Sequence, residues 1–157
     1  MKITVDSNIV FSAILNPNSS IGQILINGSK YFDFYSINYL KEEISNHSQK
    51  ILKITGYSND KFEEIYDLII TKIRFVDDVL LSDSSLKKAY KLTSDIDEDD
   101  TLFVALNNHL KSLLWTGDKV LVKGLKDKGY LRTISTSELH ELLLKKKFKS
   151  KRKPKNP

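Results

Sequence analysis

The feature that most constrains the fold of this chain is an alternation of short apolar segments with longer segments of helical periodicity. KITV at 2–5 is short and β-branched, and the next segment, SNIVFSAIL, has apolar residues at helical spacing. Further strands are predicted at 32–37, 74–79, 112–116 and 130–135. Helices are predicted at 7–15 (resuming before Gly28), 38–52, 59–73, 83–92, 99–110, 117–129 and 136–147. Strand–helix–strand succession favours parallel pairing, so we predict a three-layer α/β/α sandwich with a mostly parallel central sheet.

Side chains that can cap helices precede several of these segments. The predicted N-caps are Asn38, Asn59 or Asp60, and Thr136 or Ser137, because their side chains can accept hydrogen bonds from the first turn.

The composition limits the chemistry that this fold can carry. With 157 residues, 40% of them apolar, the chain suits one domain with a single core. It has no cysteine, which excludes disulfides, thiolate zinc sites and cysteine nucleophiles, and it has only three histidines. A metal site is therefore expected to use oxygen ligands, which suit Mg²⁺ or Mn²⁺.

Charge divides the chain into two predicted parts. Residues 145–157, KKKFKSKRKPKNP, hold eight of the 25 Lys and Arg residues and no acid, so the rest carries 17 basic and 20 acidic residues. We predict a folded domain at 1–144 and a basic, disordered tail at 145–157. The tail is also a candidate arm for nucleic acid, with contacts to phosphate from Lys151, Arg152 and Lys153.

The sequence also bears on location. No segment approaches 18 consecutive apolar residues, so no membrane-spanning helix is expected. The first residues are apolar, but Asp6 and Asn8 interrupt them and no clean cleavage site of small residues follows. We therefore expect a cytoplasmic protein without a membrane partner.

Acidic residues that are far apart in the sequence are expected at one edge of the sheet. Asp6 follows the first strand, Asp118 follows the strand at 112–116, and the helix that leads into that strand begins with acids. Parallel sheets bind ligands at the carboxyl ends of their strands. Each acid alone suits a helix cap or a dipole partner. Together they would repel one another and raise one another's pKa unless a divalent cation neutralises them.

A fourth acid comes from the helix predicted at 38–52. At 100° per residue, Glu43 lies about 60° from Leu40, at the border of the apolar face, whereas Glu42 lies about 160° away and points outward. Glu43 is therefore the glutamate that can reach a central site.

These motifs, in this order, resemble the PIN-domain nucleases, and in particular the VapC-type toxins and their relatives. VDSNIVFSAIL resembles the opening strand and turn of the family, and YLKEEI resembles its helix with an inward glutamate. DEDDTLFVAL and LLWTGDK resemble its Asp-led third motif and its Thr-x-Asp motif. YLRTISTSELHELL resembles its closing strand and helix, so the resemblance covers about residues 2–144.

The resemblance implies an activity and a set of site residues. It makes Asp6, Glu43, Asp100 and Asp118 the catalytic, metal-binding acids, with Asn8 orienting Asp6 and Thr116 supporting the site. It implies Mg²⁺- or Mn²⁺-dependent endonucleolytic cleavage of RNA, often by the toxin of a toxin–antitoxin pair. RNA, an antitoxin protein and a second copy of the chain are therefore the implied partners. Lys119 and Lys123 are candidate contacts to RNA phosphates.

Two points stay open within this resemblance. Helical phase from the apolar residues at 102–110 turns Asp99 inward more than Asp100, whereas the family pattern favours Asp100, so Asp97 and Asp99 remain supporting candidates. The chain also departs from the family pattern at Val120, where many relatives carry another acid, and at Asn107, where many have a small residue.

Other functions were weighed against the same residues. A haloacid-type phosphatase needs a second aspartate where this chain has Asn8, and a receiver domain needs an acidic pair where it has Val5 and Asp6. No Gly-x₄-Gly-Lys phosphate loop occurs. The remaining alternative is a non-catalytic PIN-like module that binds RNA or a protein.

Overall fold

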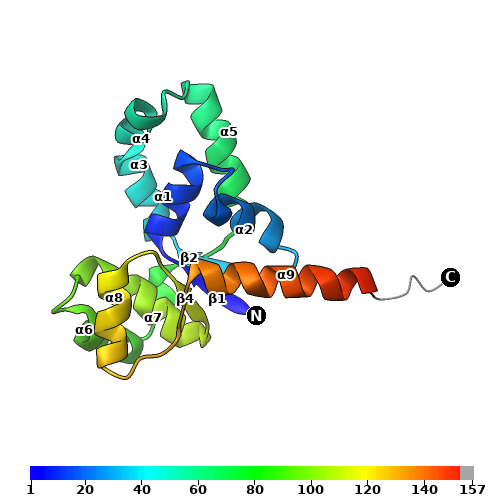
Figure 1. Cartoon of the computed structure of the whole chain (residues 1–157). Helices are drawn as coiled ribbons and strands as arrows, with labels where there is room; N and C mark the ends of the chain where they lie inside the picture. Colours follow the sequence, from blue (N-terminus) through cyan, green and yellow to red (C-terminus); the bar gives the residue numbers. More distant parts are fainter. Residues whose placement is uncertain (153–157) are drawn as a thin grey trace.

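The computed structural model describes residues 1–152, which form a five-stranded parallel sheet with helices on both sides (Figure 1). The strands are β1 (Lys2–Val5), β2 (Asp33–Ile37), β3 (Arg74–Val76), β4 (Leu113–Trp115) and β5 (Thr133–Ile134). Their order is β3-β2-β1-β4-β5, and every neighbouring pair is parallel. The chain builds outward from β1 on one side and then on the other. The β1–β4 boundary is therefore the switch point, where open α/β sheets bind ligands.

The helices complete three layers. They are α1 (Ser7–Leu15), α2 (Ser20–Gly28), α3 (Tyr39–Asn46), α4 (Ser48–Thr55), α5 (Asn59–Ile70), α6 (Asp83–Thr93), α7 (Thr101–Leu110), α8 (Lys119–Asp127) and α9 (Thr136–Arg152), with the 3₁₀ turns η1 (Asp78–Leu80) and η2 (Glu98–Asp100). Figure 1 shows α6, α7 and α8 on one side of the sheet and α1 to α5 on the other. The predicted α/β/α sandwich is confirmed.

Burial explains why β1 lies at the centre. Ile3, Thr4 and Val5 are completely buried, as expected for a parallel strand covered on both faces. On β4, Trp115 is also completely buried, and its ring lies 5.9 Å from that of Phe34 on β2. Burying each large apolar side chain stabilises the fold by about 1.5–3 kcal/mol. The central strands are therefore held firmly, and so are the residues that follow their carboxyl ends.

One membrane-related finding concerns α1 and α2. Within residues 1–152, no single helix has the length and apolar character needed to cross a membrane, and α1 and α2 meet the criterion only jointly, as a pair bent by 104°.

The helices predicted to begin at residues 59 and 136 do begin there, but none of the predicted capping side chains makes the cap. Asn38 has helical dihedral angles and makes no capping hydrogen bond with its side chain. Ser58 caps α5 by accepting a hydrogen bond from the Lys61 amide at 3.1 Å. The Ser135 hydroxyl accepts from the Glu138 amide at 3.1 Å, and Glu138 accepts from the Ser135 amide at 2.8 Å. This capping box requires the serine three residues before the glutamate, which places the cap of α9 one residue earlier than predicted.

The predicted helix at 38–52 is interrupted at His47. The backbone there leaves the helical region, with φ −105° and ψ 8°, and the chain continues as α4. The His47 ring nitrogen Nδ1 lies 2.8 Å from the Glu43 carbonyl oxygen, so the side chain competes for a helical acceptor. The interruption makes α3 a short helix that carries Glu43.

The basic segment also differs from the prediction, because α9 continues through Arg152 and residues 145–152 are helical rather than disordered. The Lys146 ammonium lies 5.8 Å from the centre of the Phe32 ring, and the hydroxyls of Tyr31 and Ser150 are 3.4 Å apart. Lysine favours helices, and these contacts anchor the segment despite its like charges. Lys153 lies outside the described residues.

Candidate functional site

The carboxyl edge of the sheet brings four acids together from four elements. Asp6 follows β1 and precedes α1, and Asp118 follows β4 and precedes α8. Asp100 is the last residue of η2, immediately before α7, and Glu43 lies on α3. These are the positions that the sequence pattern predicted to share one edge. Their role as metal ligands stays a prediction.

Asp6 is the most buried member of the group, with 2% of its surface exposed. Its Oδ1 accepts a hydrogen bond from the Ser7 amide at 2.7 Å, and its Oδ2 accepts from the Thr116 hydroxyl at 2.7 Å. Burial raises the pKa of Asp6, and the hydrogen bond from Thr116 opposes that rise. The carboxylate is therefore fixed in orientation by donors from two strands' ends.

Thr116 and Asn8 join the first strand to the turn that carries Asp118. Thr116 Oγ1 accepts hydrogen bonds from Asn8 Nδ2 at 3.2 Å and from the Asp118 amide at 3.1 Å. Asn8 Nδ2 also lies 3.4 Å from Asp6 Oδ2, and Asn8 Oδ1 accepts from the Gly117 amide at 3.1 Å. Two of the predicted supporting residues, Asn8 and Thr116, thus contact the Asp6 carboxylate.

Asp118 caps a helix and also lies near the other acids. Its Oδ1 accepts hydrogen bonds from the amides of Val120 and Leu121, each at 3.0 Å, so it is the N-cap of α8. Its negative charge also raises the pKa of Asp6 and of Asp100, which places its carboxylate within electrostatic range of both. A capping role therefore does not remove Asp118 from the site.

Glu43 and Asp100 each have a buried carboxylate oxygen without a hydrogen-bond partner. These atoms are Glu43 Oε1 and Asp100 Oδ2. Burial first, and then the negative charge of Asp6, raises the pKa of each residue to about 7. Buried polar atoms in native proteins almost always have a partner, so these two oxygens are candidates for binding a ligand.

Asp99 and Asp100 differ in burial, although the charge of Asp99 contributes to the raised pKa of Glu43. Asp100 is half-buried, whereas Asp97 and Asp99 are exposed. Asp97 Oδ1 accepts a hydrogen bond from the Asp99 amide at 2.9 Å, which caps the η2 turn. Helical phase pointed to Asp99 because it assumed an α-helix through residue 99, but residues 98–100 form a 3₁₀ turn with a different angular period.

The donor set fits a hard divalent cation, although the side chains are not closed around one. Within residues 1–152, no group of three or more Asp, Glu or His side chains is arranged so that it could hold a metal ion as it stands. Uncompensated carboxylates repel one another and stay apart until a cation neutralises them. Two unpartnered carboxylate oxygens beside a third buried carboxylate are the ligands that Mg²⁺ and Mn²⁺ prefer.

Ser7 is a site residue that sequence reasoning missed. Its amide binds Asp6, and its hydroxyl lies 3.5 Å from Asp6 Oδ1 and 3.5 Å from Glu43 Oε2. Its side chain therefore contacts both acids. Its place directly after Asp6, in the first turn of α1, was the signal that could have identified it.

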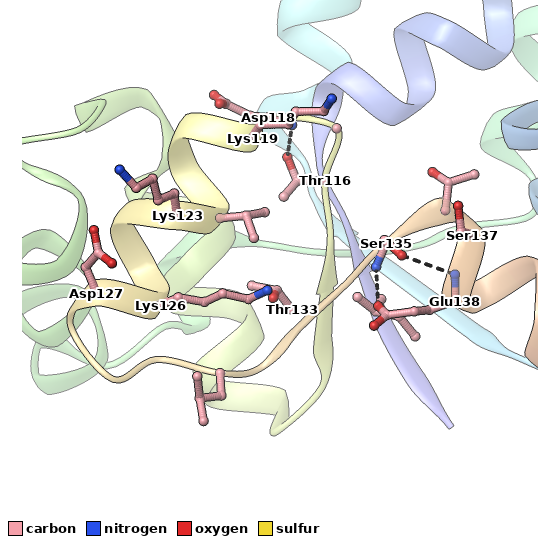
Figure 2. Close-up of a pocket in the computed structure, with 15 residues that line it drawn as sticks. Thr116, Asp118, Lys119, Lys123, Lys126, Asp127, Thr133, Ser135, Ser137 and Glu138 are labelled. Carbon is pink, nitrogen blue, oxygen red and sulfur yellow. Dashed lines mark hydrogen bonds between the residues drawn. The ribbon is translucent and has the colours of Figure 1, made fainter.

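The predicted lysines are divided between two edges of the sheet. Lys119 and Lys123 line a cleft of about 900 Å³ together with Thr116 and Asp118 (Figure 2). The basic end of α9 contacts Tyr31 and Phe32, which precede β2, and so lies at the opposite, amino edge. Figure 1 shows α9 running toward the side on which the chain begins. Lys151 and Arg152 are thus remote from the acids.

Comparisons with known proteins agree with this architecture. A family model described as the PIN domain matches residues 4–144. This chain belongs to the PIN domain family. The uncharacterised protein MJ1680 of Methanocaldococcus jannaschii is 28% identical over 135 residues, covering 84% of this chain and 80% of that protein.

The PIN fold is also found in a solved complex. The crystal structure of VapBC2 from Rickettsia felis, bound to a DNA fragment from the promoter, contains a chain that superimposes with a TM-score of 0.62. The match covers 86% of this chain and 98% of that chain at 17% identity. At this level of identity the likeness concerns the fold.

Proposed function

We propose that this PIN-domain protein is a divalent-metal-dependent endoribonuclease. The observation that carries the proposal is the pair of buried, unpartnered oxygens of Glu43 and Asp100 beside the fixed carboxylate of Asp6. Asp6, Glu43, Asp100 and Asp118 would hold Mg²⁺ or Mn²⁺. When bound, such an ion supplies charge neutralisation at a phosphate and activation of water.

The side chains of the chain itself would perform two tasks in this reaction. Thr116 and Asn8 hold the Asp6 carboxylate in one orientation, which spares reorganisation when the substrate binds. Glu43 and Asp100, with pKa values near 7, carry protons for part of the time at neutral pH and would release them when a cation binds. No side-chain nucleophile is needed.

The test combines cleavage with metal binding. The Asp6→Asn, Asp118→Asn double variant should lose at least about 10²-fold in cleavage of a fluorogenic RNA with Mg²⁺ or Mn²⁺ present. Calorimetric titration of the parent with Mn²⁺ in two buffers should also report proton release, which the Glu43→Gln variant reduces. Unchanged RNA degradation by the double variant would contradict the mechanism. RNA binding without cleavage by the parent would favour a non-catalytic module.

We further propose a toxin role in the cytoplasm, with an antitoxin that covers the acidic edge. This rests on the resemblance to VapC-type toxins and on the likeness in fold to VapBC2. Val79, Leu80 and Val120 are 79%, 66% and 71% exposed, and all follow the carboxyl ends of strands, so they offer apolar contacts at that edge. Co-expression with the product of an adjacent short reading frame should restore growth. Size measurement of the free chain tests the predicted homodimer.

A further inference from the structure

The cleft beside Asp118 has two walls of different chemistry. One wall is the exposed side of α8, and the other is the segment from β5 to the first turn of α9 (Figure 2). Hydroxyls of Thr133, Thr136 and Ser137 lie on the second wall. The apolar side chains of Val122 and Leu131 also line the cleft. Such a cleft offers hydrogen bonds and apolar contacts next to a charged wall.

The charged wall is a row of three lysines on one face of α8. Lys119, Lys123 and Lys126 are spaced four and three residues apart, so they lie within about 60° of one another around the helix axis. Leu121 and Leu125 are completely buried on the other side of the helix. At 1.5 Å per residue the row is about 10 Å long. Figure 2 shows Lys126 directed across the cleft toward Thr133.

The positive charge of this row is not neutralised by ion pairs within the part of the chain that the structure describes. None of the three ion pairs found within residues 1–152 involves Lys119, Lys123 or Lys126. Two further acids line the cleft besides Asp118, but Glu138 is engaged in the capping box with the Ser135 amide and Asp127 lies at the far end of α8. The row therefore starts beside Asp118 and leads away from it.

Position decides between the two basic surfaces of the molecule. The basic end of α9 is at the amino edge of the sheet, whereas the lysine row of α8 begins next to Asp118 at the carboxyl edge. A strand of nucleic acid whose phosphate reaches the acids must pass along a neighbouring surface. Only the α8 row, of these two, borders one of the four acids, Asp118.

We propose that the α8 cleft binds the sugar–phosphate backbone of single-stranded RNA on one side of the bond that is cleaved, an inference that rests on the ribonuclease function proposed above. A single row of cations about 10 Å long spans roughly three nucleotides of one strand and matches one backbone rather than the two of a duplex. Lys126 is a binding residue in this assignment, and the apolar side chains receive the bases.

The experiment compares three triple variants of equal charge change. The Lys119→Gln, Lys123→Gln, Lys126→Gln variant removes the row. A second variant, Lys145→Gln, Lys149→Gln, Lys151→Gln, tests α9, and Lys50→Gln, Lys53→Gln, Lys61→Gln is the matched control on α4 and α5. Binding of a labelled short RNA is measured by fluorescence anisotropy in EDTA over a range of salt concentrations, which needs no catalytic activity. Circular dichroism verifies that each variant is folded.

The α8 variant should bind the RNA at least about tenfold more weakly at low salt, and its slope of log K against log[salt] should be shallower by about 2, since each phosphate contact to a single strand contributes about 0.7. The α9 and control variants should stay close to the parent. Equal weakening in all three variants, weakening confined to the α9 variant, or no RNA binding by the parent would overturn the assignment. Equal affinity for duplex RNA would overturn the single-strand assignment.

A cleavage assay distinguishes failure of this inference from failure of the proposed ribonuclease function. With Mn²⁺ present, the α8 variant should show a raised KM and a nearly unchanged kcat, because the row positions RNA without touching the reacting phosphate. A parent that binds RNA through α8 but does not cleave it would contradict the ribonuclease proposal while supporting the cleft. A parallel series with DNA of the same sequence shows whether the cleft distinguishes the two sugars.

Discussion

At the scale of the residue, identical side chains at one sheet edge differ because their partners differ. Asp6 has hydrogen-bond donors on both of its carboxylate oxygens, whereas Asp100 has a buried oxygen without one. Asp6 is therefore held in place by the fold, and Asp100 has an interaction left to make. The same contrast separates Thr116, whose hydroxyl contacts three residues of the site, from an ordinary turn threonine.

The Thr116→Val variant should weaken Mn²⁺ binding by about tenfold, as expected when a residue that orients a metal ligand is lost. Losing the hydroxyl also raises the pKa of Asp6 further, since that hydrogen bond lowers it. The loss should consequently be larger at pH 6 than at pH 8, where protons compete less. Thr116→Ser keeps the hydroxyl and is the matched control. Equal affinities of all three proteins for Mn²⁺ would contradict the role of Thr116.

The Asp100→Asn variant should be more stable than the parent in the absence of metal at pH 8. It removes one of several mutually repelling carboxylates, an effect of about 1 kcal/mol after allowance for solvent screening. For a chain of this size that corresponds to a rise in Tm of roughly 2–4 °C, measured by thermal denaturation in EDTA. Exposed Asp83→Asn is the control, and it should leave Tm almost unchanged. A lower Tm in Asp100→Asn would show that the carboxylate stabilises the fold.

At the scale of the element, α8 packs closely against the loop that precedes the η2 turn. A Cβ placed on Gly124 of α8 would lie 2.3 Å from Ile96 Cδ1, so any larger residue there would force the Ile96 side chain to shift. Lys128, at the end of α8, binds both the Asp95 carboxylate and the Leu92 carbonyl oxygen. The helix that begins at Asp118 therefore fixes the loop that leads to Asp100.

The Gly124→Ala variant should lower both stability and cleavage. Forcing a methyl group against Ile96 costs about 1–3 kcal/mol in packing and displaces the turn that carries Asp100. Urea denaturation and the cleavage rate measure the two effects. The Ile96→Ala, Gly124→Ala double variant should recover part of the cleavage lost in Gly124→Ala. A double-mutant cycle with no coupling energy would mean that the contact does not position the turn.

A second link between elements is a buried polar network around Asn107. Its amide donates to the Tyr130 hydroxyl at 2.7 Å and to the Arg132 carbonyl oxygen at 3.1 Å, and its Oδ1 accepts from the Ser112 hydroxyl at 2.7 Å. Asn107 is completely buried, and these bonds join α7 to the segments that directly precede β4 and β5. Many relatives have a small residue at this position, and the network gives Asn107 a structural role here. That role does not involve the acids.

The Asn107→Ala variant should be destabilised by about 1–3 kcal/mol, because Ser112 and Tyr130 lose a partner inside the protein. Urea denaturation measures the change in the free energy of unfolding. Asn108→Ala, at the neighbouring and less buried position, is the control and should cost less. Metal affinity should be equal to that of the parent in both variants, since neither residue contacts the acids.

At the scale of the whole molecule, charge is distributed between the two edges of the sheet. The acids gather at the carboxyl edge, and the basic end of α9 lies at the amino edge.

The pKa values of Glu43 and Asp100, raised to about 7, exceed those of the unfolded chain, so the folded state binds these protons more tightly. Stability from this source is complete below the ordinary carboxyl pKa and is lost as the pH rises to about 7.

The metal-free protein should accordingly lose thermal stability between about pH 5 and pH 8, and Mn²⁺ should restore it at pH 8 more than at pH 5. The Glu43→Gln, Asp100→Asn double variant, which removes both titrating groups, should show a flatter dependence and a smaller effect of Mn²⁺. Tm is measured across the pH range with EDTA or Mn²⁺. A parent whose Tm falls no more than that of the double variant over this range would contradict the predicted linkage.

The sequence by itself determined the α/β architecture and placed Asp6 and Asp118 at one sheet edge. Apolar periodicity specifies strands and helices locally, and an acid that directly follows a strand must emerge at its carboxyl end. Helical phase favoured Asp99, and only the family pattern favoured Asp100, because a 3₁₀ turn and an α-helix cannot be told apart from the sequence over three residues.

Only the tertiary structure decided what depends on contacts between distant segments. Ser7 touches both Asp6 and Glu43 because α1 and α3 pack together, and no local pattern encodes that meeting. The basic segment is helical, and it lies away from the acids because α9 runs back along the sheet against Tyr31 and Phe32. Charge and periodicity are properties of the chain, but which charges become neighbours is settled by packing.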